Sequence, residues 1–321
     1  MFPLEIAPKS AYNQRKMVFF YMFPLIIGKW SCCQNRGKKL TLHDQNCDII
    51  LRFAVTVSSV FSRYNRVMKI QFASDLHLEF RENWRYLRDN GPMDVKGDIL
   101  VLAGDTGYLG DDMYSVHPFW NWASENFEQV LVVLGNHEFY KYYDLKTMQD
   151  GLVGEIRPNV HYYYNKVVTI RDVDFIISTL WAYIDPDNAI VTERGVADFY
   201  RIVYGENLLR YSDFNSEHQR CLDFIKKSVS ASQAKHKVVV THHVPSYQLV
   251  APEFQGSRIN GAFSVELADY IADNGIDYWI YGHSHRNIDK TIGTTRCLCN
   301  QFGYVSHNEH LTFDRGKIIE V

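Results

Sequence analysis

Cysteine is scarce in this sequence, and its spacing excludes disulfide-dense and zinc-ribbon domains. The chain of 321 residues has six cysteines, and none shows the paired spacing of a zinc ribbon or a disulfide framework. We therefore expect a reduced, cytoplasmic setting. The pair Cys297 and Cys299 could bind a metal or act in redox chemistry, but without a second pair we interpret both as ordinary strand residues. The six positions are Cys32, Cys33, Cys47, Cys221, Cys297 and Cys299.

The sequence also has no apolar segment long enough to span a bilayer. The run from Met17 to Ile27 has about ten residues, contains Pro24, and is not followed by a clear small-residue cleavage site. We expect no membrane partner. A secretory signal or a targeting segment is the weaker alternative for this part of the chain.

Basic residues are in excess only in the first part of the chain. Residues 1–67 contain ten Lys and Arg against three Asp and Glu, whereas the remainder contains 24 against 34. The net charge of −3 therefore averages a basic leader of +7 and an acidic body of −10. Because nucleic-acid binding depends on Lys and Arg that neutralise phosphates, the acidic body argues against that partner. A phosphate substrate remains compatible, since bound cations would supply positive charge.

Met68 marks a change in the character of the chain. The residues after it, Lys69 to Asp75, have the pattern of the first strand of an α/β domain. We expect residues 68–321 to form the catalytic domain, with translation starting at Met68, and residues 1–67 to be an N-terminal extension outside the natural protein. The alternative is a targeting or membrane-associated leader.

Short apolar runs rich in β-branched residues recur along the body, and each ends abruptly in a polar loop. Helix candidates lie between several of these runs, from Ser216 to Ser230 and from Ser264 to Gly275. This alternation predicts an α/β fold in which helices cover the sheets. The runs are Ile70 to Ala73, Ile99 to Ala103, Val130 to Leu134, Val238 to Val240 and Tyr278 to Tyr281.

Two further segments alternate between apolar and polar residues, which predicts hairpins. The first, His161 to Trp181, would turn at Asn165 and Asp172. The second, Leu311 to Val321, would turn at residues 314–316.

Each of the five apolar runs is followed at once by residues that can bind a metal ion. Such residues meet at one place because ligands in open α/β sheets gather at the carboxyl ends of the strands. Each signal alone is weak, but five in a fixed order are hard to attribute to chance. Carboxylate and amide oxygens together with imidazoles suit Mn, Fe or Zn. The five motifs are Asp75-Leu76-His77, Gly104-Asp105, Gly135-Asn136-His137-Glu138, His242-His243 and Gly282-His283-Ser284-His285.

Over residues 68 to about 310, these motifs resemble the complete signature of the calcineurin-like metallophosphoesterases. The resemblance implies two packed mixed β-sheets flanked by helices, a four-layer α/β/β/α sandwich, and a site for two metal ions. Thr106-Gly107-Tyr108 follows the second motif in place of the Asp-Arg-Gly of Ser/Thr protein phosphatases, which argues against that activity. The resemblance assigns Asp75, His77 and His285 to one metal ion, Asn136, His242 and His283 to the other, and Asp105 to a bridging position.

The expected activity is hydrolysis of a small-molecule phosphate monoester or diester by a hydroxide that bridges the two ions. His137 is the candidate general acid for the leaving group, although it could instead orient a neighbouring ligand. For Glu138 and His243 we favour support of the ligands over direct catalysis. The alternatives are a nuclease of the same family and a noncatalytic metal-binding scaffold.

Aromatic and basic residues outside the motifs could shape the substrate site. The region from Asp185 to Asn215 is rich in Tyr and Arg and predicts either a cap that grips a phosphate ester or a solvated helix packed on the body. Near the motifs, Tyr108, Tyr140 and Tyr142 could line the pocket or belong to the core.

Overall fold

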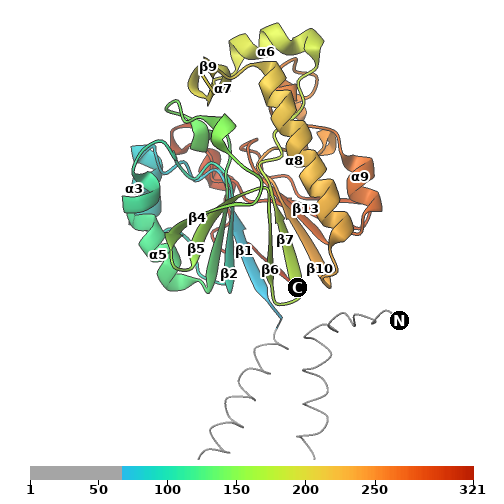
Figure 1. Ribbon diagram of the computed structural model, residues 1–321. Coiled ribbons are helices and arrows are strands. Elements are labelled where there is room, and N and C mark those ends of the chain that lie inside the picture. The colour runs from blue at the N-terminus through green and yellow to red at the C-terminus, as the bar shows by residue number, and fades with distance from the viewer. Residues whose placement is uncertain (1–66) are drawn as a thin grey trace, which may run out of the picture. The chain divides into compact units, whose positions relative to one another are not determined.

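Two β-sheets lie face to face and carry helices on their outer faces (Figure 1). The computed structural model describes residues 67–321, so the predictions for residues 1–66, including the apolar run from Met17 to Ile27, lie outside the described residues. The start of the natural protein at Met68 stays a prediction. The four-layer α/β/β/α arrangement is confirmed.

Both sheets have six strands, with parallel strands in the middle and antiparallel strands at the edges. The first sheet has the order β14 (Ile318–Glu320), β1 (Lys69–Ala73), β2 (Ile99–Ala103), β3 (Gln129–Val133), β5 (Val160–Tyr164) and β4 (Leu152–Arg157). The second has the order β12 (Lys290–Ile292), β13 (Thr295–Cys299), β11 (Tyr278–Tyr281), β10 (His236–Val240), β7 (Val173–Ile177) and β6 (Lys166–Ile170).

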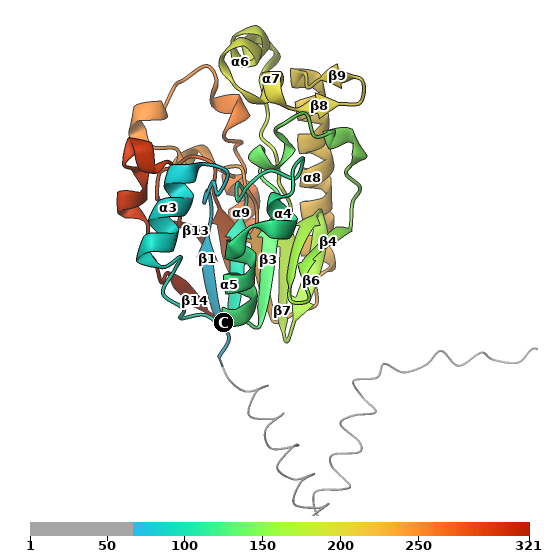
Figure 2. The same ribbon diagram turned by 90° about the vertical axis from the view of Figure 1, so that its left-hand side faces the viewer.

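The helices divide between the two outer faces and a segment above the sheets (Figures 1 and 2). The first sheet is covered by α3 (Arg81–Asn90), α4 (Met113–Val116) and α5 (Pro118–Asn126). The second is covered by α8 (Tyr211–Ala231) and α9 (Ala268–Asp273). The segment above the sheets holds α6 (Ala189–Gly195), α7 (Asp198–Arg201) and the small pair β8 (Val203–Tyr204) and β9 (Asn207–Leu208). Single 3-10 turns are η1 (His137–Phe139), η2 (Leu145–Thr147), η3 (Pro186–Asn188), η4 (Tyr247–Leu249), η5 (Pro252–Phe254), η6 (Asn260–Ala262), η7 (Val305–His307) and η8 (Glu309–Thr312).

Alternation along the strands explains why the two sheets pack together. Phe72 and Val101 from the first sheet meet Phe175 from the second in one buried cluster between the sheets. Their neighbour Leu100 points the other way and packs with Trp120 of α5. Because successive strand residues face opposite sides, a strand that is apolar throughout needs a layer on both faces. The continuous apolar runs of the sequence thus encode the four layers.

All five predicted runs form strands, but the flanking predictions need correction. The helix predicted from Ser216 begins earlier, at Tyr211, because Asp213 accepts a hydrogen bond from the backbone of Arg210 at the true helix start. The helix predicted from Ser264 begins only at Ala268, whose backbone donates to the Glu266 carboxylate. In both cases the helix start was mispredicted because the capping side chain is an acidic residue and not the expected serine.

One predicted hairpin is confirmed. The turn predicted at residues 314–316 is present but belongs to no hairpin, and the hairpin turn predicted at Asn165 is wrong. Strands β6 and β7 form the hairpin around Asp172. Asn165, with a φ of 44°, instead marks the point at which the chain passes from the first sheet to the second. The C-terminal segment forms no hairpin, because Glu320 and its neighbours pair with β1 while residues 309–312 form a 3-10 turn.

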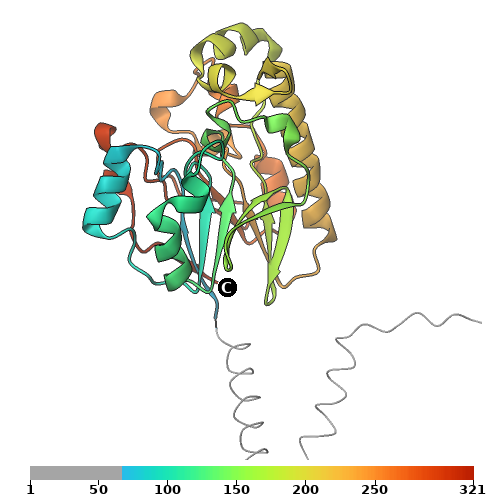
Figure 3. The same ribbon diagram turned by 60° about the vertical axis from the view of Figure 1, so that its left-hand side comes forward.

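The parallel strands of both sheets end at a common edge. Beyond the strand ends, Ser74 after β1 bridges to Gln301 after β13, which joins the two sheets there. The segment with α6 and α7 lies above this edge (Figures 2 and 3). Within residues 67–321, no helix is long and apolar enough to cross a membrane.

Gly104 allows β2 to end against the loop that follows β10. Its φ is 91°, a value that residues with a side chain rarely adopt, and a Cβ atom at this position would overlap the imidazole of His242. Gly151 has a similar φ of 84°, but a Cβ atom there would meet nothing within 4 Å. The two glycines share a backbone conformation and differ in crowding.

We predict that Gly104→Ala lowers the free energy of unfolding by about 2–4 kcal/mol, because crowding adds to backbone strain. Gly151→Ala, the matched control, should cost only the strain, about 1 kcal/mol. Urea denaturation of the metal-free proteins measures both values. Equal losses in the two variants would contradict a close approach between Gly104 and His242.

Candidate metal centre

The strand ends bring all seven predicted metal ligands and the predicted acid into one buried group. Among these residues His285 is the most accessible, and its side chain is only 13% exposed. The loop after β1 supplies Asp75 and His77, and the loop after β2 supplies Asp105. The remaining residues are Asn136 and His137 after β3, His242 after β10, and His283 and His285 after β11.

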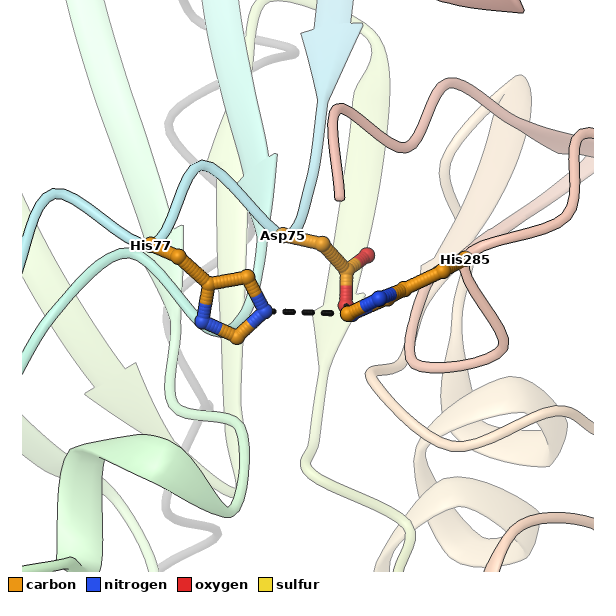
Figure 4. Close-up of side chains that lie close together, drawn as sticks. All are labelled: Asp75, His77 and His285. Atoms are coloured by element: carbon orange, nitrogen blue, oxygen red, sulfur yellow. Dashed lines mark hydrogen bonds and ion pairs between the residues drawn. The ribbon is translucent and has the colours of Figure 1, made fainter. Parts of the chain in front are cut away.

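Asp75, His77 and His285 form the first group of possible ligands (Figure 4). The Nε2 atoms of His77 and His285 lie 3.1 Å apart, and His285 Nε2 is 3.3 Å from Asp75 Oδ1. Three donor atoms that face one point at these distances could share one cation.

Asp105, His242 and His283 form the second group. His242 Nε2 is 3.0 Å from His283 Nδ1 and 3.3 Å from Asp105 Oδ1. Asn136 joins this group, since its Oδ1 lies 3.0 Å from His242 Nε2.

The carboxylate of Asp105 faces both groups. One oxygen points to His242, and the other, Oδ2, lies 3.8 Å from Nε2 of His77 in the first group. Oδ2 is also 3.9 Å from Nε2 of His137, so Asp105, His77 and His137 form a third possible combination. The two oxygens of Asp105 therefore face different groups of possible ligands.

Most of the ligand candidates sit on strained backbone. The φ values are positive at Asp75 (55°), His77 (46°), Asp105 (51°), His283 (75°) and His285 (48°). A left-handed conformation costs a non-glycine residue about 1–3 kcal/mol and persists only where the surrounding structure enforces it. Here the sharp turns let successive side chains point into the same site.

Each of three imidazoles is fixed by a hydrogen bond from the nitrogen that faces away from the centre. His242 Nδ1 donates to the backbone oxygen of Ala103 at 2.9 Å, and His285 Nδ1 donates to Glu309 at 2.7 Å. His77 Nδ1 donates to Glu79 at 3.0 Å. These partners define the tautomers in which Nε2 presents its lone pair to the centre. The donor set of imidazole nitrogens with carboxylate and amide oxygens fits cations such as Mn, Fe or Zn.

When no cation is bound, protonated histidines balance the negative charge of the buried carboxylates. Burial alone would lower the pKa of His285, but hydrogen bonds to Asp75 and Glu309 raise it to about 10. Burial likewise acts to lower the pKa of His242, yet the charge of Asp105 raises it to about 9. A cation can therefore enter only as these protons leave.

Glu79 is a member of the site that the sequence interpretation missed. Its buried Oε1 accepts hydrogen bonds from His77 at 3.0 Å and from His137 at 2.8 Å. Burial alone would raise the pKa of Glu79, but the charge of His77 and hydrogen bonds from both histidines lower it to about 2. The alternation Asp75, His77, Glu79 in the sequence was the available signal, although turns at Asp75 and His77, and not an extended segment, bring the three side chains together.

Glu138 holds the loops after β2 and β3 together. Its carboxylate accepts hydrogen bonds from the backbone nitrogens of Asp105 (3.0 Å), Thr106 (2.7 Å) and Gly135 (2.6 Å). It also accepts from the hydroxyl of Tyr114 at 2.7 Å. These contacts agree with a supporting role. His243 similarly lies beside the centre, with its ring centroid 4.3 Å from that of His283.

The segment from Asp185 to Asn215 contributes side chains next to the candidate ligands. Asp198 of α7 accepts hydrogen bonds from Asn136 Nδ2 at 2.8 Å and from the hydroxyl of Tyr140 at 2.7 Å. Arg201, also of α7, lies over the ring of Tyr140, 5.2 Å from its centroid. No sequence pattern indicated Asp198 or Glu309, because their partners are distant in the chain.

A cleft of about 460 Å³ opens from the centre to the surface between this segment and the loops from Val244 to Ser264. Of the three tyrosines considered above, Tyr140 lines the cleft. The ring of Tyr108 lies 6.4 Å from that of His137, and Tyr142 is 68% exposed and outside the cleft.

Cys297 and Cys299 are unpaired, buried thiols of β13, as expected for strand residues. Burial raises the pKa of Cys297 to about 12 and also raises the pKa of Cys299, so neither thiol is poised to ionise.

The family model for calcineurin-like phosphoesterases matches residues 68–287. The chain belongs to this family. Its members are metal-dependent, which agrees with the clusters of possible ligands described above. Membership supports a phosphoesterase as the general class of enzyme.

Two relatives illustrate the extent of the similarity. An uncharacterized protein of Acanthamoeba polyphaga mimivirus is 26% identical over 268 residues, which cover 75% of this chain and 92% of the relative. The crystal structure of phosphopantetheinyl hydrolase from Mycobacterium tuberculosis is 17% identical, with a TM-score of 0.55, and the match covers 79% of this chain and 95% of that protein. At 17% identity, the similarity to the hydrolase shows that the two proteins share a fold and nothing more.

We predict that this phosphoesterase binds metal more tightly as the pH rises from about 6 to 8. His242 and His285 must lose protons on binding, so the apparent affinity should rise by up to about tenfold per pH unit for each proton released. The metal-free protein should show the opposite trend. Its raised histidine pKa values stabilise the fold below the unfolded value of about 6.5, and this contribution is lost as the pH rises through 9 to 10.

Calorimetric titration with Mn²⁺ in buffers of different ionisation enthalpy counts the protons released. Thermal unfolding of the metal-free protein at each pH measures the second trend. Metal binding without proton release at pH 7 would contradict the protonation state assigned to the two histidines.

Proposed function

We propose that the protein hydrolyses a small-molecule phosphate ester with two metal ions at this centre. The observation that carries the proposal is the position of Asp105, whose two carboxylate oxygens face separate groups of ligands. In this proposal Asp75, His77 and His285 hold one ion and Asn136, His242 and His283 hold the other. When bound, such a pair supplies a hydroxide nucleophile near neutral pH and neutralises phosphoryl oxygens. The candidate ions are Mn, Fe and Zn.

The contacts of His137 support its role as the proton donor for the leaving group. Its Nδ1 donates to Glu79, which leaves Nε2 directed into the cleft beside Asp105. Burial alone would lower the pKa of His137, but the charge of Asp105 and the hydrogen bond to Glu79 raise it. A carboxylate behind a histidine favours the protonated ring and fixes its orientation.

The proposed substrate class includes phosphate monoesters and phosphate diesters. A panel of both kinds with added Mn²⁺ tests the proposal, and a phosphopantetheinyl ester belongs in it because of the related fold. Single-stranded DNA tests the nuclease alternative, which the acidic body disfavours. A protein that binds metal and hydrolyses no ester would instead be a scaffold.

We predict that Asp105→Asn abolishes hydrolysis and lowers the metal content, because the bridging position would lose its charge. Asn136→Ala should mainly weaken one of the two sites. Asp89→Asn, which removes an exposed carboxylate on α3, is the control and should leave metal content and rate unchanged. Metal analysis of the purified proteins decides the matter. Two ions per chain retained in Asp105→Asn would argue against a bridging carboxylate.

We also predict that His137→Ala retains both ions but loses rate according to the leaving group. A general acid contributes roughly 10² to 10⁴ in rate where the leaving oxygen needs a proton, and far less for nitrophenolate. The measurement is kcat/KM for esters of graded leaving-group acidity, with the surface variant His307→Ala as control. Equal losses for every ester, together with weaker metal binding, would show that His137 only orients a ligand.

A further inference from the structure

We infer that the substrate carries an elongated apolar substituent on its phosphate, an inference that rests on the proposed function. The cleft that opens from the metal centre is bounded on one side by side chains without hydrogen-bonding groups. We call this surface the apolar wall. It consists of Val250, Ala251, Phe254, Ile259 and Phe263.

The apolar wall begins at the metal centre itself. The ring of Phe263 stacks on the imidazole of His283, with centroids 4.9 Å apart and an interplanar angle of 30°. The backbone nitrogen of Val244, two residues after His242, donates to the backbone oxygen of Phe263 at 3.1 Å. A phosphate held at the centre would therefore direct one of its substituents along the wall.

The wall is held in place at both ends. Arg258 donates to the Asn188 side chain at 3.0 Å, which ties the loop to the segment above the sheets. The guanidinium of Arg286 lies over the ring of Phe254, 5.4 Å from its centroid, and donates to Glu253 at 2.8 Å. These contacts hold the surface in place before a ligand binds. Little conformational entropy is therefore lost when the ligand binds.

Two large aromatic side chains remain unusually accessible in this cleft. Phe254 of the wall is 40% exposed, and Phe80 on the side nearer His137 is 38% exposed. Covering such surfaces with a hydrocarbon removes apolar area from water and is favourable. The volume of about 460 Å³ is in the usual range for small ligands.

A strongly polar substituent fits this wall poorly. Asn260 donates to the backbone oxygen of Phe254 at 2.6 Å, and the hydroxyl of Ser264 donates to the backbone oxygen of Asn260 at 3.3 Å. Both side chains thus direct their donors into their own loop. The five side chains of the wall offer no hydrogen-bonding group, so sugar hydroxyls placed against them would lose water without gaining partners from the wall, which is costly.

The test is equilibrium binding of n-alkylphosphonates, which are not hydrolysed, to the full chain with Mn²⁺. Affinity measured by calorimetry should rise by about two- to fourfold per methylene and level off once the cleft is filled. The rate constant kcat/KM for n-alkyl phosphates and their methyl diesters should rise in parallel, because the acidity of the leaving alcohol barely changes along the series.

Variants of the apolar wall test whether the dependence of affinity on chain length arises at the wall or from nonspecific hydrophobic binding elsewhere. Phe254→Ala and Ile259→Ala should flatten the dependence on chain length without weakening the shortest phosphonate, and Phe254→Leu should restore part of it. Ile190→Ala, an exposed position on α6 outside the cleft, is the matched control and should change nothing.

Affinity that is independent of chain length in the unmodified protein, or tighter binding of nucleoside monophosphates than of heptylphosphonate, would overturn the inference. Hydrolysis of none of the esters while phosphonate affinity still rises with length would instead overturn the proposed function and leave the apolar wall as a binding site.

Discussion

The hydrogen bonds to the buried carboxylate of Glu138 are the constraint on which the rest of the centre depends. A carboxylate without access to water needs several donors, and the backbone nitrogens of two separate loops provide them. Asp105 and Asn136 can face each other only while those loops stay in register. Burial and the nearby charge of Asp105 raise the pKa of Glu138 to about 7. The geometry of two candidate ligands is thus set by a residue that need not touch a metal.

Hydrogen bonds also fix the orientation of three histidines in the centre. Glu79 and Glu309 each accept a hydrogen bond from the outer nitrogen of a ligand candidate, and the backbone oxygen of Ala103 does so for His242. A neutral imidazole has one donor and one acceptor nitrogen, so fixing the donor also fixes the direction of the acceptor. The three acceptors lie at different separations in the sequence from the histidines that they contact. Together they fix imidazole rings on three different loops.

The sequence predicted the features that depend on local pattern. An apolar run followed by a polar motif is a property of a few neighbouring residues, and all five such segments form strands that end at the centre. The start of α8 was misplaced because Asp213, rather than Ser216, caps it. The C-terminal residues were assigned to a hairpin, whereas Ile318 and its neighbours pair with the first strand of the domain.

The supporting residues were harder to predict because they act across long separations. Glu309 and its partner His285 are 24 residues apart, and Asp198 and its partner Asn136 are 62 apart. No periodicity links such positions, and only the folded chain brings them together. Glu79 is the exception, since it lies two residues from His77 and continues the alternation of the first motif. The local pattern was sufficient to find the candidate ligands that the structure groups together, and it was not sufficient for most of the residues that orient them.

The contact between Asp198 and Asn136 joins the segment that covers the cleft to a candidate metal ligand. Asp198 lies on the same short helix as Arg201, which lines the cleft. A substitution that reshapes this helix to admit a different molecule would therefore also displace the amide of Asn136, a candidate metal ligand. Selection for a new specificity in this lineage would be constrained by metal retention, so variation should accumulate more readily on the opposite side, in the loops around Phe254.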